Sequence, residues 1–108
     1  MVGMRSAATE MENAMEDETE QLRQAILADM EAPEAELLAE FTDDSPGVHE
    51  ALHMASFLMR AIEAELMEHQ AVACRPEWFS LSHRAFSALF DLYQAIGAAE
   101  RGAQSAEA

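Results

Sequence analysis

Apolar residues between Pro46 and Gly97 recur at alternating spacings of three and four, which is typical of helices that pack along one another. The set over 46–70 is Val48, Leu52, Ala55, Met59, Ile62, Leu66 and His69. Two adjacent sets occur over 76–97: Phe79, Ser82, Phe86, Leu89, Tyr93 and Ile96, and Trp78, Leu81, Ala85, Ala88, Leu92 and Ala95. A half-buried strand would need apolar residues at every second position, and no stretch sustains that pattern. The sequence therefore predicts an all-α fold.

The boundaries of these two helices carry the usual signals. Ser45 is expected to cap the first helix and Pro46 to begin it, because proline lacks the N–H that a first turn leaves unpaired. Pro76 is expected to begin the second helix, and Gly97 to end it. The connection between them is short, so the helices should pack antiparallel. We therefore expect a long antiparallel helical hairpin over 45–97.

Each of these helices is apolar around more of its circumference than one packing seam occupies. The first helix has further apolar residues, Ala51, Met54, Phe57, Leu58 and Ala61, and the second has its two adjacent apolar sets. A helix apolar on that many sides needs more than one packing partner. Either the N-terminal helices fold back to complete a bundle, or two hairpins associate. Because the apolar stripe of the N-terminal helices is too narrow to cover both faces, we favour a homodimer that completes a four-helix bundle. The residues expected at its interface are Phe57, Trp78, Phe86, Phe90 and Tyr93.

The 108-residue chain has a net charge of −15, no lysine, and a strong charge asymmetry. Residues 1–50 hold 14 acidic residues against two arginines, a net of −12; residues 51–108 hold 7 against four, a net of −3. Such a field repels phosphates, so nucleic acids and anionic membranes are not expected partners. It would attract a basic protein partner, or serve solubility alone.

The location of the protein is expected to be cytoplasmic. No apolar run approaches the ~20 residues that span a bilayer, and the first residues lack the apolar core of a signal peptide. The single cysteine, Cys74, cannot form an internal disulfide.

The remaining segments differ from the hairpin in composition. Residues 1–8 are expected to form a flexible tail, and residues 9–44 an acidic helical arm with its linker. The arm has a thin apolar stripe, interrupted by like charges, so its helix should be only marginally stable in isolation. Residues 98–108 are rich in Ala, Glu, Gly and Ser and are expected to be a disordered tail.

One string, His49-Glu50-Ala51-Leu52-His53, matches the H-E-x-x-H pattern of zinc proteases. That chemistry needs a third metal ligand and a strand that holds the substrate, and neither is predicted here. The two histidines fall on the polar side of the first helix. A solvated helix face is the favoured interpretation, and His49, Glu50 and His53 are weak candidates for metal ligands.

Glu50 and His53 also match the Glu-x-x-His pair of di-iron helical bundles. Those sites need further carboxylates that project inward from other helices. The last helix offers Glu77, Asp91 and Glu100, and none of these is expected on its apolar faces. No cofactor is therefore predicted.

The functional hypothesis that best fits these features is a small acidic protein–protein interaction module of the adaptor, inhibitor or assembly-chaperone type, without catalytic activity. The first alternative is a metal-binding helical bundle that uses His49, Glu50 and His53. The second is an acidic mimic of DNA that binds a basic protein, based on the −12 charge of residues 1–50.

Overall fold

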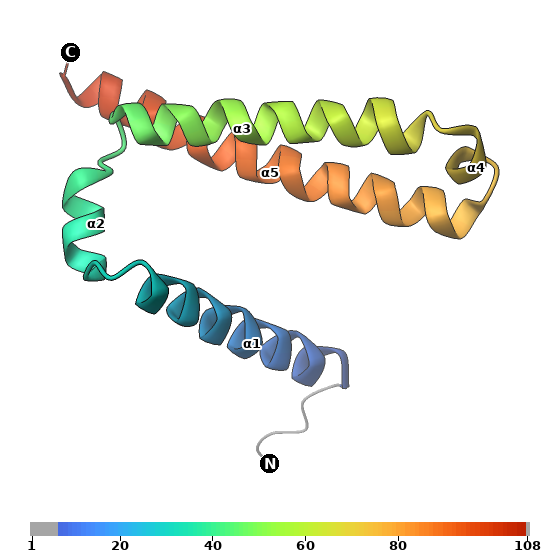
Figure 1. The fold of residues 1–108 in the computed structure, drawn as a ribbon, viewed down its shortest axis with the longest axis horizontal. Coiled ribbons are helices and arrows are strands. Elements are labelled where there is room, and N and C mark those ends of the chain that lie inside the picture. The colour runs from blue at the N-terminus through green and yellow to red at the C-terminus, as the bar shows by residue number, and fades with distance from the viewer. Residues whose placement is uncertain (1–6, 108) are drawn as a thin grey trace. The chain divides into compact units, whose positions relative to one another are not determined.

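The computed structural model describes residues 7–107, and every regular element in this range is helical (Figure 1). The predicted all-α class is confirmed. The elements are α1 (Ala7–Asp29), α2 (Glu34–Glu40), α3 (Pro46–Ile62), the π-helix η1 (Glu63–Met67), α4 (Gln70–Ala73) and α5 (Pro76–Glu107). The chain divides into two compact units, with the boundary between Ala39 and Glu40. The expected tail over 1–8 lies outside the described residues, except that Ala7 and Ala8 belong to α1.

Helix α3 begins as the sequence predicts. The Ser45 backbone is extended, with φ −73° and ψ 154°, and its hydroxyl oxygen accepts a hydrogen bond from the Val48 backbone N–H at 3.3 Å. Pro46 follows in the first turn, where its missing N–H costs no hydrogen bond. The start of α3 is therefore fixed by local chemistry.

Helices α3 and α5 pack along each other and run in opposite directions (Figure 1). At this contact Ala55 of α3 and Ser82 of α5 are buried, with exposed fractions of 4% and 8%. The Ser82 hydroxyl donates to the Phe79 carbonyl at 2.8 Å, so this buried polar group is satisfied. Half-buried residues extend the contact along both helices: Val48, Leu52, Met59, Ile62, Phe86, Leu89, Tyr93 and Ile96.

The expected single helix over 46–70 is interrupted near its end. In η1 the Glu68 N–H donates to the Glu63 carbonyl five residues earlier, at 3.0 Å. This wider turn takes up an extra residue and changes the helical phase, and Leu66 is 45% exposed. His69 does not continue the seam. Its Nδ1 accepts from the Ala71 N–H at 3.1 Å and caps α4, which occupies the expected connection.

The end of α5 also differs from expectation. We expected a stop at Gly97 and a disordered tail over 98–108, but α5 continues to Glu107. A glycine that ends a helix does so in a left-handed conformation, and Gly97 instead stays within the helix and is buried. A Cβ at Gly97 would lie 3.8 Å from Cδ1 of Leu52, so the glycine sits where α3 approaches closely. Its role is packing between helices.

Gly97→Ala should stabilise the protein by favouring the helical conformation of α5. The tightest neighbour of the added Cβ would be Nη1 of Arg101 at 3.1 Å, the end of a flexible side chain that can move aside. Alanine in a helix interior is favoured over glycine by about 0.5–1 kcal/mol. The free energy of unfolding, measured by urea titration, should rise by that amount. A decrease would mean that Leu52 cannot accommodate the methyl group.

In the first unit, α1 and α2 are linked by an arginine. Two N–H groups of Arg23 donate to the Glu20 carboxylate at 2.9 and 2.7 Å, and a third donates to Glu34 of α2 at 3.0 Å. The hydrogen bonds from Arg23, aided by one from Gln24, lower the pKa of Glu20 from 4.5 to about 2. Glu31, in the turn between the helices, has a left-handed backbone with φ 56°.

The lowered Glu20 pKa sets the pH range over which this cluster stabilises α1 and α2. A carboxyl group with a depressed pKa contributes its full stabilisation above its ordinary pKa, and loses it as pH falls toward the depressed value. The helical content of wild type should therefore exceed that of Arg23→Gln at neutral pH. The difference should vanish between pH 4.5 and about 2. Circular dichroism of both proteins across this range tests it, and a constant difference would contradict it.

Candidate interaction surface and histidine cluster

Most large apolar side chains of this protein are exposed. Among the residues whose side chains are described, Ala55 is the only apolar side chain that is buried, and 16 large hydrophobic residues are exposed. Exposed apolar residues scattered singly are normal, but contiguous apolar surface marks an interaction site. The arrangement of these residues on α3 and α5 therefore decides whether they form an interaction site.

Each of these two helices has a second apolar stripe, in which every residue directly precedes a residue of the contact face. One residue corresponds to a rotation of about 100° around an α-helix, so the stripe lies beside the contact face. Because α3 and α5 are antiparallel (Figure 1), equal rotations bring both stripes to the same side of the pair. We call this surface the apolar flank. It consists of Ala51, Met54, Leu58 and Ala61 of α3, and Trp78, Leu81, Ala85, Ala88, Leu92 and Ala95 of α5. Its large residues are 44–60% exposed.

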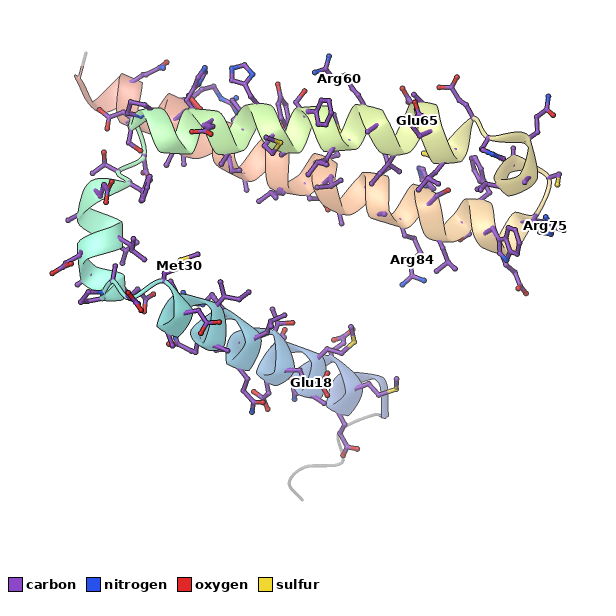
Figure 2. The ribbon with its side chains drawn as sticks, in the orientation of Figure 1. Glu18, Met30, Arg60, Glu65, Arg75 and Arg84 are labelled. Atoms are coloured by element: carbon purple, nitrogen blue, oxygen red, sulfur yellow. The ribbon has the colours of Figure 1, made fainter. Side chains whose placement is uncertain are left out.

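At one end of the pair, the flank has a shallow apolar depression. Its lining is Leu66, Val72, Trp78, Leu81, Ser82 and Ala85. The Arg75 guanidinium lies over the Trp78 ring, 4.3 Å from its centroid, and this cation–π contact orients the indole. Figure 2 labels Arg75 at this end, together with Arg84, which projects away from the contact between α3 and α5.

The predicted interface residues are not on one surface. Trp78 lies on the apolar flank and is 49% exposed, whereas Phe57 is 58% exposed on the outer side of α3. By helical phase Phe90, 42% exposed, lies on the opposite flank. Phe86 and Tyr93 are half-buried at the α3/α5 contact. Leu81 and Leu92 were not among the residues predicted at the interface, although they share a stripe with Trp78 and are also exposed.

The two histidines of the H-E-x-x-H string meet a carboxylate from α5. Nδ1 of His49 lies 3.0 and 3.1 Å from the two carboxylate oxygens of Glu100. Nε2 of His53 lies 2.9 Å from Nε2 of His49, with the rings edge to face. The His49 side chain is 56% exposed, whereas that of Glu100 is 13% exposed. The three side chains form a connected polar cluster at one edge of the α3/α5 contact.

This cluster corrects the expectation about the acidic residues of α5. Glu100 follows Ile96 by four residues and so continues the face that packs against α3. We did not expect it there because the helix was predicted to end at Gly97. Glu50 takes no part in the cluster and lines a shallow depression with His53, Met54, Phe57 and Arg60. In the part of the chain whose side chains are described, no three His, Cys, Asp or Glu residues are grouped so as to ligate a metal together.

No helix in the described part of the chain has both the length and the apolar character needed to cross a membrane. Comparisons with family models, with characterised proteins and with solved structures found no match to this chain. The apolar flank, the charge asymmetry and the histidine cluster are therefore the basis for a functional proposal.

Proposed function

We propose that this protein is a non-catalytic interaction module that forms a homodimer through its apolar flank and binds a basic protein through its acidic N-terminal helices. The observation that carries the proposal is the apolar flank itself. Its α5 stripe has the spacing of a coiled-coil seam, contains no charged residue, and exposes Trp78, Leu81 and Leu92 to solvent. Covering these side chains is favourable by ~25 cal/mol per Å² of apolar surface.

A second copy of the chain fits this stripe because the stripe is complementary to itself. In a twofold dimer, α5 would pack antiparallel to α5 of the partner around a point between Phe86 and Ser87. The pairs across that axis are Trp78 with Ala95, Leu81 with Leu92, and Ala85 with Ala88. The largest residue faces a small one, and alanines at the centre permit close approach. Side chains of two helices interdigitate when large residues of one face small residues of the other.

The charge distribution agrees with this division of roles. Residues 51–108 have a net charge of only −3, so two copies of α5 repel each other weakly. Helix α1 contains seven acidic residues and a single basic one, Arg23. It also exposes the apolar residues Met15 and Leu22, at 63% and 61%. An acidic helix with an exposed apolar stripe is complementary to a basic partner that has apolar anchors.

Sedimentation equilibrium of the tag-free protein over a range of concentrations tests the dimer. The expected result is a reversible monomer–dimer equilibrium that tolerates high salt, because apolar contacts dominate the interface. A compact monomer at every concentration up to hundreds of micromolar would refute self-association through the flank.

A photo-reactive residue in place of Leu22 tests the acidic helix separately. Cross-linking in the native cell should yield basic proteins, and the same cross-link in lysate should weaken as salt is raised. The matched control replaces Glu16, Asp17 and Glu18 by their amides, which removes charge and preserves shape. An unchanged cross-link in this control would contradict the proposed role of charge.

A further inference from the structure

We propose that His49 and His53 form a two-histidine site for a late first-row divalent metal ion, such as Ni²⁺, Cu²⁺ or Zn²⁺, with Glu100 positioning His49. Imidazole nitrogens are the preferred ligands of these ions. The two histidines are four residues apart on α3, so one helix face presents both without any further folding. By helical phase this face lies opposite the apolar flank, so the site does not depend on dimer formation.

The spacing of the two nitrogens matches that of neighbouring ligands on one ion. Metal–imidazole bonds of about 2.0–2.1 Å place two ligand nitrogens about 2.9 Å apart at a right angle and about 3.3 Å apart at the tetrahedral angle. Nε2 of His49 and Nε2 of His53 are 2.9 Å apart. This separation equals that of square-planar or octahedral coordination, as in Cu²⁺ and Ni²⁺, once both rings turn so that their lone pairs face the ion. Tetrahedral Zn²⁺ requires a small opening of the pair.

Glu100 supplies the outer contact that metal-binding histidines usually have. A carboxylate only accepts hydrogen bonds, so Nδ1 of His49 carries the hydrogen that is donated to Glu100. Nε2 of neutral His49 then accepts a hydrogen bond from Nε2–H of His53, so an ion that binds both nitrogens requires His53 to carry its ring hydrogen on Nδ1 instead. A carboxylate on the far nitrogen fixes the ring orientation and the tautomer of a ligand histidine. Glu50 takes no part in the cluster, so the proposed site does not use it as the catalytic glutamate of a zinc protease.

Two protein ligands leave the other coordination positions to water, so the bound ion should exchange readily. Calorimetric titration of the tag-free full chain with NiCl₂ or ZnCl₂ is expected to show one ion per chain, and titration with MgCl₂ no binding. His49→Ala and His53→Ala should each abolish the one-to-one binding. Glu100→Gln should weaken it by about 10- to 100-fold, as expected for loss of an outer-sphere partner. Circular dichroism of each variant verifies that it remains folded.

Two matched controls distinguish this site from its alternatives. Glu50→Gln should bind the metal ion with unchanged affinity, because Glu50 lies outside the cluster. A loss of affinity comparable to that of Glu100→Gln would favour the H-E-x-x-H arrangement and overturn the proposal. His83→Ala removes an exposed histidine of α5 that stacks near Phe79 and Phe86. It should also leave the affinity unchanged.

A measurement on the unmodified chain keeps the test independent of variant folding. Substoichiometric Cu²⁺ should broaden the ring signals of His49 and His53 in NMR spectra before those of His69 and His83. Equal broadening of all four histidines, or no stoichiometric binding in calorimetry, would mean that the cluster is only a hydrogen-bonded structural contact.

Discussion

Leu81→Glu is expected to convert the proposed dimer into a monomer. Leu81 is 60% exposed on the apolar flank and faces Leu92 of the partner in the proposed packing. Burial of a leucine side chain contributes about 1.5–3 kcal/mol. A twofold dimer contains the substitution twice, so the loss of binding free energy is doubled. The expected loss of about 3–6 kcal/mol corresponds to a dissociation constant raised by roughly two to four orders of magnitude. Sedimentation equilibrium measures this change directly.

The matched control for this substitution is Gln94→Glu. It adds the same side chain to the same helix, at an exposed position that helical phase places away from the apolar flank. The helical content of both variants should equal that of wild type, since neither position lies in the α3/α5 contact. A Leu81→Glu protein that still forms the dimer would show that a second copy does not cover the flank.

Ala55→Glu is expected to abolish the packing of α3 on α5. Ala55 is 4% exposed at the centre of that contact, where its small side chain lets the helices approach. A larger side chain in a well-packed contact costs about 1–3 kcal/mol through overpacking alone. An unpaired buried carboxylate adds a desolvation cost of several kcal/mol. The total is comparable to the whole stability of a small domain, ~5 kcal/mol at the lower end.

Thermal unfolding followed by circular dichroism checks this expectation. Wild type should unfold cooperatively, and Ala55→Glu should show no cooperative transition. Ala64→Glu makes the same chemical change at an exposed position of η1 and should unfold close to the wild-type temperature. Equal unfolding temperatures for all three proteins would mean that the α3/α5 contact contributes little to stability.

The pattern of the sequence is sufficient to predict the all-α class and the start of α3. The Ser45 cap and the following proline act within one turn, and apolar spacing defines the faces of α3 and α5 without reference to the rest of the chain. The ends of these helices are less predictable. Gly97 has the same chemistry whether it ends a helix or makes room for a neighbour, and the choice depends on Leu52, far away in the sequence.

The candidate sites depend even more on contacts that sequence spacing does not encode. The His49–Glu100 pair joins residues 51 apart, and it exists because α5 continues past Gly97 and lies alongside the start of α3. From the sequence, the residues of the dimer interface could be chosen only by their size and aromatic character. These criteria selected Phe86 and Tyr93. Their half-buried positions follow from which face of α5 meets α3.

The sequence by itself determined that this chain is helical, where its strongest helix begins and which residues share each helix face, because these properties depend on interactions within a few turns. Tertiary structure decided which of the two apolar stripes on α5 forms the internal contact and which remains exposed. It also decided which carboxylate reaches His49. These outcomes depend on how two helices align along their length, and that alignment is set by the summed packing of residues far apart in the chain.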